Sequence, residues 1–392
     1  MTVLRQHLID PEICIRCNTC EETCPIDAIT HNDDNYVVNA DLCNYCMDCI
    51  APCPTGSIDN WRMVNAAYSI DEQFEWDELP EELELDDETS NSGGEADNEA
   101  EDLLHQAHSG ARAVPPFSAA HPYINLYSRD DPIIAKVAGN FRITGADTDS
   151  DIRHIILDFG STAFPVLEGQ SIGILPPGQT ASGKAHTMRL YSIASPRDGE
   201  RQNHNNVSLT VKRVDGGVAS NYLCDLQKGD EVKVIGPFGD SFLMPNHPEA
   251  NIIMICTGTG SAPFRAFTER RRRKYQDADG KLMLFFGART PTELPYFGPL
   301  NKLPDSLIQK ELVFSRQAGK PKEYVQDRMR KSAENIAPLL QDENTFIFVC
   351  GLKGMEQGVE EALNDIAASQ KVDWAALRND MLANGRYHVE TY

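Results

Sequence analysis

Hydrophobic and polar positions follow two different patterns along most of the chain. Between Tyr123 and Pro245, short stretches alternate apolar and polar residues and are separated by Gly, Pro and Asp, as in IRHIILDF, VSLTVKRV and DEVKVIGPF. Alternation with a period of two, broken by frequent turn residues, is typical of antiparallel strands. This part of the chain is predicted to form an antiparallel β-barrel.

After Pro245 the apolar stretches become continuous. NIIMICTGTGSAPFRAFTERRRRKY has the pattern of an apolar strand, a glycine turn and a helix, and KLMLFFGAR, KELVFSR and TFIFVCG are further apolar strands. Strands that are apolar on both faces lie in a parallel sheet covered by helices on both sides, so we predict a doubly wound α/β domain. The glycine turn alone is weak evidence for a ligand, because tight turns often need Gly for positive φ.

Length and charge restrict the possible partners. The chain has 392 residues, of which 41% are hydrophobic, and a formal net charge of −23 from 59 acidic and 36 basic side chains. This length predicts two or three domains, and the negative charge argues against nucleic acid or an anionic membrane as the partner. The start, MTVLRQHLIDPE, has no secretion signal, and no apolar run reaches the ~18 residues of a membrane span. A cytoplasmic protein is expected.

The negative charge is concentrated in one segment. No Lys or Arg lies between Arg62 and Arg112, whereas Asp and Glu are abundant there. Low hydrophobicity and repulsion between like charges predict a flexible, extended linker over residues 66–118. The alternative is a docking arm for a basic partner protein.

Eight of the 11 cysteines lie within the first 53 residues and form two copies of one motif. The spacing C-x2-C-x2-C-x3-C followed by proline occurs twice, 29 positions apart. In a reducing cytosol such cysteines are metal ligands, and this spacing is that of bacterial two-cluster ferredoxins, whose fourth cysteine binds the other cluster. The alternative is a pair of structural zinc sites. The expected 4Fe-4S sets are Cys14, Cys17, Cys20 and Cys53 for cluster 1, and Cys43, Cys46, Cys49 and Cys24 for cluster 2.

These patterns predict a multidomain chain. The predicted parts are an α+β two-cluster ferredoxin domain, the acidic linker, the β-barrel and the α/β domain, at residues 1–65, 66–118, 119–245 and 246–392. A ferredoxin domain carries electrons one at a time, so the remaining domains are expected to supply them.

A set of motifs after residue 119 resembles the plant-type ferredoxin–NADP+ reductases in order and spacing. These motifs are RLYSIAS, GVASNYL, CTGTGSAPFRAF, FFGARTPTELPY, FSRQAGKPKEYVQDRM, FVCGLKGMEQGVEEAL and the terminal YHVETY. The resemblance covers roughly residues 119–392 and implies an enzyme that binds FAD and NADPH.

The resemblance implies roles for individual residues on the flavin side. Arg189 would hold the FAD pyrophosphate with help from Ser220, and Tyr191 would stack on the isoalloxazine ring, with Ser192 near N5. Tyr392 would cover the opposite face of the ring, where nicotinamide must arrive. One departure is the short DGG between VKRV and VASN, which leaves no counterpart to the tyrosine that stacks on the FAD adenine in plant enzymes.

The same resemblance implies the nucleotide site. The catalytic set would be Ser192, Cys350, Glu390 and Tyr392. Binding of NADP would involve Gly258, Thr259, Gly260, Ser315, Arg316, Lys322, Tyr324 and Gln326. Arg316 and Lys322 would pair with the 2′-phosphate, whereas an NAD site usually offers a carboxylate there; the alternative is that both are ordinary solvated charges.

The fusion of a ferredoxin to a reductase, beginning with HLIDPEICIRCNTCEETCPIDAI, is similar to reductase components of aerobic benzoyl-CoA 2,3-epoxidase systems. In these systems NADPH electrons reach a separate di-iron oxygenase in benzoate degradation. This resemblance implies electron flow from NADPH to FAD, to two 4Fe-4S clusters, and then to the oxygenase. The alternatives are a general ferredoxin–NADP+ oxidoreductase with another redox partner, and a non-enzymatic electron carrier.

Overall fold

We describe a computed structural model of the chain, which covers residues 4–50, 53, 55–58, 61–80, 103, 106 and 114–392. It divides into two compact units, an N-terminal one and a larger one that contains the other two sheets. Each unit is described by itself. Most of the predicted linker, 66–118, lies outside the described residues.

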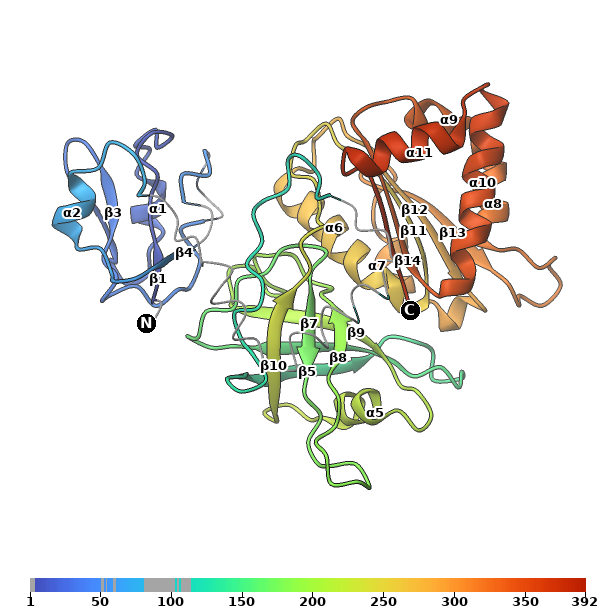
Figure 1. Cartoon of the computed structure of the whole chain (residues 1–392), viewed down its shortest axis with the longest axis horizontal. Helices are drawn as coiled ribbons and strands as arrows, with labels where there is room; N and C mark the ends of the chain where they lie inside the picture. The colour runs from blue at the N-terminus through green and yellow to red at the C-terminus, as the bar shows by residue number, and fades with distance from the viewer. Residues whose placement is uncertain are drawn as a thin grey trace. The chain divides into compact units, whose positions relative to one another are not determined.

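The N-terminal unit contains two small antiparallel sheets connected by cysteine-bearing loops (Figure 1). One sheet pairs β1 with β4, and the other pairs β2 with β3. The bounds are β1 Leu4–His7, α1 Thr19–Glu22, β2 Ile29–His31, β3 Tyr36–Val38, β4 Trp61–Val64 and α2 Ile70–Phe74. The small core is formed by cysteines and apolar residues together, among them Ile29 and Ile58, which are related by the 29-residue repeat.

Helix α2 lies inside the segment that the sequence analysis assigned to the linker. Its N-terminus has a capping box, in which Ser69 accepts a hydrogen bond from the Glu72 amide. The buried Gln73 side chain donates to Val38 O at 2.9 Å and accepts from Val38 N at 3.1 Å. The folded part of this unit therefore continues at least to Phe74, beyond the domain end predicted at residue 65.

The first sheet of the larger unit is a six-stranded antiparallel barrel, as predicted. The strand order is β8-β7-β10-β5-β6-β9, and a bridge between Ile193 and Leu209 joins the two ends. The bounds are β5 Ile133–Arg142, β6 Ile152–Asp158, β7 Ser171–Ile174, β8 Arg189–Ser192, β9 Asn206–Lys212, α5 Val218–Asp225 and β10 Glu231–Phe238. Strand β5 alternates buried and exposed residues, which is the pattern of a barrel wall with one apolar face.

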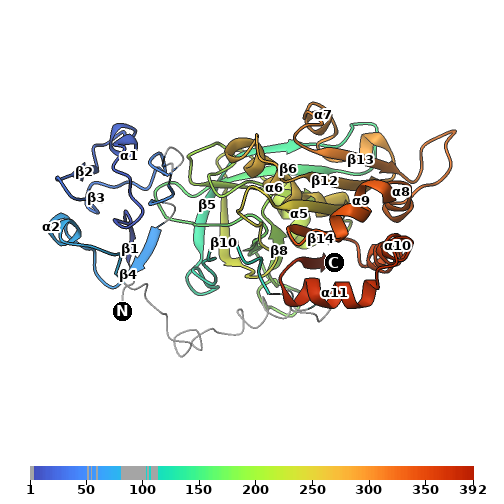
Figure 2. The same cartoon turned by 90° about the horizontal axis from the view of Figure 1, so that it is seen from above.

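The second sheet is five-stranded and parallel, in the order β13-β12-β11-β14-β15. Helices cover both of its faces (Figures 1 and 2). The bounds are β11 Asn251–Thr257, η1 Gly258–Gly260, α6 Ser261–Lys274, β12 Leu282–Ala288, η2 Pro291–Glu293, α7 Phe297–Asn301, β13 Gln309–Phe314, α8 Val325–Lys331, α9 Ala333–Leu340, β14 Thr345–Gly351, η3 Lys353–Met355, α10 Glu356–Ser369, α11 Trp374–Ala383 and β15 Tyr387–Thr391.

The two faces of this sheet form separate cores because side chains alternate along each strand. On one face, Ile253 and Ile255 of β11 pack with residues of α8, α9, α10 and α11. On the other face, Ile252 and Met254 pack with Phe264 and other residues of α6. The predicted doubly wound domain is confirmed. In the described part of the chain, no helix is long and apolar enough to cross a membrane.

Candidate active site and cluster sites

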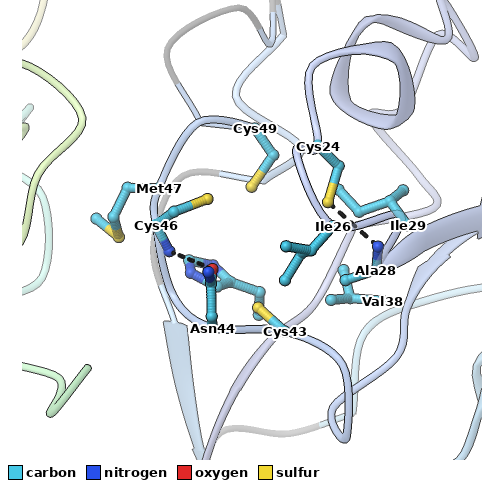
Figure 3. Close-up of a pocket in the computed structure, with 11 residues that line it drawn as sticks. Cys24, Ile26, Ala28, Ile29, Val38, Cys43, Asn44, Cys46, Met47 and Cys49 are labelled. Carbon is cyan, nitrogen blue, oxygen red and sulfur yellow. Dashed lines mark hydrogen bonds between the residues drawn. The ribbon is translucent and has the colours of Figure 1, made fainter.

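The N-terminal unit contains a cavity that four cysteine side chains surround (Figure 3). Three of them, Cys43, Cys46 and Cys49, belong to the second motif, and the fourth is Cys24, the last cysteine of the first motif. The other lining residues are His7, Ile26, Ala28, Ile29, Val38, Asn44 and Met47. The structure thus brings together the crossed set predicted for cluster 2.

The remaining cysteine of the second motif, Cys53, lies with the first motif. Burial, together with the nearby thiolates of Cys14 and Cys53, raises the pKa of Cys20 to about 11. Cys53 also acts electrostatically on Cys17. Burial favours the neutral thiol of Cys53, but hydrogen bonds from Ser57, the Ile58 amide and Thr55 outweigh it and lower the pKa to about 7. The four cysteines predicted for cluster 1 are therefore neighbours as well.

The cysteine arrangement fits an iron–sulfur cluster better than zinc. Thiolates on one zinc ion all lie about 2.3 Å from it, so they must converge on a point. The four cysteines around the cavity come from a C-x2-C-x2-C run and from a cysteine that precedes a proline. This donor set and spacing fit the larger 4Fe-4S unit, which favours the cluster interpretation over the zinc alternative.

The flavin-side residues lie on β8 and α5 of the barrel. Tyr191 is partly buried, and burial raises its pKa well above the usual range. The nearby Cys224 of α5 also raises this pKa, whereas Arg189 lowers it. The Arg189 guanidinium is exposed and donates to Thr187 Oγ1 and Met188 O, while its other N–H groups can bind a phosphate oxygen. An exposed cation beside a half-buried phenol ring fits a cofactor with a pyrophosphate and an aromatic ring.

Ser192 and Ser220 differ in their surroundings. Ser192 is partly exposed at the end of β8. Ser220 is buried in α5, and its Oγ accepts a hydrogen bond from Val214 N at 3.2 Å. This bond closes the short DGG turn ahead of α5, so Ser220 also stabilises that turn.

The nucleotide loop follows β11, the central strand of the parallel sheet. Gly258 has φ +56°, and a Cβ on Gly260 would lie 2.2 Å from Cys350 O, so only glycine fits there. Gly258, Thr259 and Gly260 thus form a 3-10 turn between β11 and α6, next to the end of β14. This place is the topological switch point of the sheet, where doubly wound folds bind dinucleotides.

A second group of predicted nucleotide residues follows the edge strand β13. Ser315, Arg316, Lys322 and Tyr324 lie in the loop between β13 and α8, and Gln326 lies in the first turn of α8. Arg316 and Lys322 are exposed, and the Lys322 ammonium lies 4.8 Å from the Tyr324 ring centroid. These are cations and an aromatic ring available to a phosphate and a base.

The acidic residue of this loop is already paired. Hydrogen bonds from Arg328, followed by Lys331, lower the pKa of Glu323 to about 2. Arg328 donates to Glu323 at 2.7 Å, and Lys331 donates to it at 2.8 Å. Because Glu323 is neutralised by these two partners, the charge of Arg316 and Lys322 remains for a ligand.

The remaining predicted residues meet at the carboxyl ends of β14 and β15. Cys350 is fully buried and pairs in register with Cys256 on one side and Glu390 on the other. Burial raises the pKa of Glu390 to about 8. Burial therefore favours the protonated carboxyl group, which can donate a hydrogen bond.

The C-terminal Tyr392 is joined to the nucleotide loop. Its hydroxyl is hydrogen-bonded to Thr259 Oγ1 at 2.6 Å, its N–H donates to Gly351 O at 2.9 Å, and the residue is about half exposed. The end of the chain therefore lies across the switch point. A nucleotide that enters there has to compete with the bond between Tyr392 and Thr259.

The sequence analysis missed Tyr296 as a link between barrel and nucleotide domain. Its hydroxyl is hydrogen-bonded to Thr210 at 2.7 Å and to His154 at 3.0 Å, both in the barrel. The Arg265 guanidinium of α6 lies 5.2 Å from the Tyr296 ring centroid and donates to Ala194 O at 2.7 Å. The motif FFGARTPTELPY contains Tyr296, but no local pattern shows which strands it reaches.

Three domain families match consecutive parts of the chain. The 4Fe-4S binding domain matches residues 7–30, the oxidoreductase FAD-binding domain matches residues 161–242, and the oxidoreductase NAD-binding domain matches residues 254–361. Together with the barrel, the doubly wound sheet and the cysteine cavity, these matches define a flavin- and nicotinamide-dependent oxidoreductase that contains an iron–sulfur domain.

Similar proteins specify the family. The chain is 41% identical over 291 residues to a ferredoxin–NADP reductase of Thermosynechococcus vestitus, covering 69% of this chain and 75% of that protein. It is 38% identical to leaf isozyme 1 of Arabidopsis thaliana, with 69% and 79% covered. The solved reductase of Plasmodium falciparum shares the fold, with a TM-score of 0.56 at 24% identity over 69% of this chain and 99% of that one.

The chain belongs to the ferredoxin–NADP reductase family. It is an NADPH oxidoreductase of this type that uses FAD and carries a 4Fe-4S ferredoxin domain in the same polypeptide. The non-enzymatic alternative is thereby set aside.

Proposed function

We propose that this protein passes electrons from NADPH through FAD and two 4Fe-4S clusters to a separate oxygenase. The observation that carries this proposal is the fusion of a reductase with an N-terminal unit in which a second set of four cysteines surrounds a cavity. A reductase that contains its own one-electron carriers needs no separate ferredoxin to accept electrons from the flavin. It needs an external protein only to accept electrons from its clusters. FAD, when bound, accepts the two electrons of a hydride and releases them singly, while each cluster carries one.

The proposed roles follow from the site. Arg189 would bind the pyrophosphate of FAD, and Tyr191 and Tyr392 would cover its ring, so that water is excluded from the site. Ser192 and Glu390 would orient the bound rings by hydrogen bonds, and buried Cys350 would provide a small apolar wall for the nicotinamide.

The proposed organisation has the four parts predicted from the sequence: a ferredoxin domain, a tether, an FAD barrel and an NADP domain. The tether starts after α2 instead of after residue 65. A tether of this kind lets a cluster approach the flavin edge in each turnover. We propose the cytoplasm as the compartment, because thiolates remain reduced there.

The proposed acceptor is the di-iron oxygenase of a benzoyl-CoA epoxidase system. Support comes from the sequence around the first cysteine motif, residues 7–29, and from its fusion to a reductase. The second candidate is a general ferredoxin–NADP+ oxidoreductase, which the names of the relatives favour.

An acceptor experiment separates these two functions. The protein is reduced anaerobically with NADPH and mixed with either the di-iron oxygenase component or a free ferredoxin, while cluster absorbance is followed. We expect faster reoxidation by the oxygenase component. Equal or faster reoxidation by the free ferredoxin would instead favour the general oxidoreductase.

A second experiment tests the choice of nucleotide. Replacing both Arg316 and Lys322 with alanine removes two charges that only the 2′-phosphate of NADPH needs. NADPH affinity should fall by on the order of 1.5–3 kcal/mol per contact, while use of NADH changes little. Steady-state kinetics with both nucleotides measures this. Lys320→Ala, an exposed cation of the same loop, is the control, and equal losses for both nucleotides would assign the residues a structural role.

A further inference from the structure

The 29-residue repeat gives each residue beside one set of cysteines a counterpart beside the other set. The backbone hydrogen bonds are equivalent in the two motifs: the Thr19 amide donates to the Cys17 sulfur, and the Asp48 amide donates to the Cys46 sulfur. Side chains do not follow it. This difference bears on the two clusters, and the inference rests on the two-cluster content proposed above.

Hydroxyl groups lie beside the cluster 1 cysteines. Thr19 Oγ1 donates to Cys17 Sγ at 3.2 Å. Ser57 Oγ lies 3.3 Å from Cys53 Sγ, and Thr55 Oγ1 lies 3.8 Å from the same sulfur. A thiolate ligand has no proton, so in each of these pairs the hydroxyl must be the donor.

The counterparts beside cluster 2 are apolar or negative. Thr55 is replaced by Ile26 and Ser57 by Ala28, and both replacements line the cluster 2 cavity (Figure 3). Ala28 contributes its amide, which donates to Cys24 Sγ at 3.2 Å. Thr19 is replaced by Asp48, whose carboxylate lies within hydrogen-bonding reach of the Cys46 sulfur.

Two polar side chains also line the cluster 2 cavity. The Asn44 amide oxygen accepts a hydrogen bond from Cys46 N at 3.2 Å. The His7 ring packs against Tyr45 and Trp61, with centroid distances of 5.9 and 5.8 Å. Asp48 is an acidic side chain beside a cysteine of this set, and its negative charge opposes the addition of an electron. On the cluster 1 side, Glu21 also lies near the cysteines, and its carboxylate is hydrogen-bonded to the His31 ring at 2.6 Å.

We propose that the two clusters are unequal, with cluster 1 taking the first electron and cluster 2 having the lower reduction potential. Reduction adds negative charge to a cluster, so hydrogen bonds to its sulfurs and contact with water favour the reduced form. Cluster 1 has three side-chain hydroxyls and the exposed Cys17, whereas cluster 2 has apolar counterparts and a carboxylate. Thr19, Ser57 and Asp48 thus act through the clusters and determine which cluster holds the first electron.

The difference in potential sets the direction of electron transfer between the two clusters. In the singly reduced protein the electron rests on the cluster whose Cys17 ligand is exposed to solvent. Cluster 1 is therefore the exit to the external acceptor, and cluster 2 donates to it.

The test is a redox titration of the intact holoprotein followed by electron paramagnetic resonance. We expect two one-electron steps, with the first electron preferring cluster 1 by about tenfold or more, which equals about 59 mV. The Cys24→Ser protein supplies the reference spectrum for cluster 1, and Cys53→Ser supplies that of cluster 2.

Side-chain variants assign the difference to its cause. Thr19→Val combined with Ser57→Ala should lower only the upper potential, and Asp48→Asn should raise only the lower one, each reducing the preference several-fold. Thr23→Val is the matched control for the first, because the Thr23 hydroxyl bonds Thr19 O and Cys20 O and not a sulfur. Asp34→Asn, in an exposed turn, is the charge-matched control for the second.

The outcomes separate this inference from the proposed function. About four iron atoms per FAD with one potential would contradict the two-cluster content itself. Eight iron atoms with equal potentials, or with potentials that the Thr19, Ser57 and Asp48 variants leave unchanged, would overturn only the inference. The reverse order, with cluster 2 reduced first, would also overturn it. That result would indicate that His7, which lines the cluster 2 cavity, has the largest effect on the two potentials.

Discussion

Replacing Cys24 with serine should damage the cluster of Cys43, Cys46 and Cys49, although Cys24 belongs to the first motif in sequence. Cys24 lines the same cavity as these three cysteines, and a serine hydroxyl is a poor replacement for a thiolate ligand. The intact protein should contain about eight iron and eight sulfide atoms per FAD, and the variant about half of each. Iron and sulfide analysis after anaerobic purification measures this.

Matched variants show which cluster is lost. Cys43→Ser should remove the same paramagnetic signal as Cys24→Ser, whereas Cys53→Ser and Cys14→Ser should both remove the other signal. If Cys24→Ser shares its spectrum with Cys14→Ser, the crossed arrangement does not hold. Stoichiometric zinc without sulfide in the intact protein would contradict the cluster assignment altogether.

The crossed cysteine sets illustrate what a sequence can predict. Spacing alone indicated that Cys24 and Cys53 exchange partners, and the structure brings each beside the cysteines of the other motif. Strand β11 was equally clear, because a run of apolar residues with no alternation has to be buried on both faces.

Features that depend on long-range pairing were not predictable in this way. Helix α2 lies in an acidic, weakly hydrophobic segment, and it is held by the contact of Gln73 with Val38, which no local pattern reveals. Tyr296 bridges two domains through partners 86 and 142 positions away. By contrast, the pair Thr19 and Asp48 becomes visible when the two cysteine motifs are superposed at their offset of 29 residues.

The nucleotide site also combines features that the sequence predicts with features that only the folded chain shows. The glycines after β11 and the cations after β13 lie where a doubly wound sheet places a dinucleotide, so their positions follow from the predicted fold. The hydrogen bond between Tyr392 and Thr259 joins the end of the chain to a loop 133 positions earlier, and only the folded chain shows it.

This bond motivates the last prediction, that Tyr392 acts as a gate over the nicotinamide position. We predict that Tyr392 leaves Thr259 before nicotinamide reaches the flavin face, so that part of the binding energy of the 2′-phosphate end is used to displace it. NADH lacks that phosphate and drives the exchange less well. In Tyr392→Ser, NADP+ should bind more tightly and NADH should become a better donor.

The stacking that is lost is worth about 0.5–1.5 kcal/mol, which corresponds to as much as about tenfold in affinity. NADPH turnover should fall in Tyr392→Ser, because tighter binding slows the release of product. Titration with NADP+ and stopped-flow reduction by both nucleotides measure these changes. Tyr392→Phe is the matched control: it keeps the ring but loses the bond to Thr259, so it should retain most of the discrimination against NADH. Unchanged NADP+ affinity and unchanged NADH activity in Tyr392→Ser would place the ring away from the flavin, and the proposed nicotinamide position would have to be abandoned.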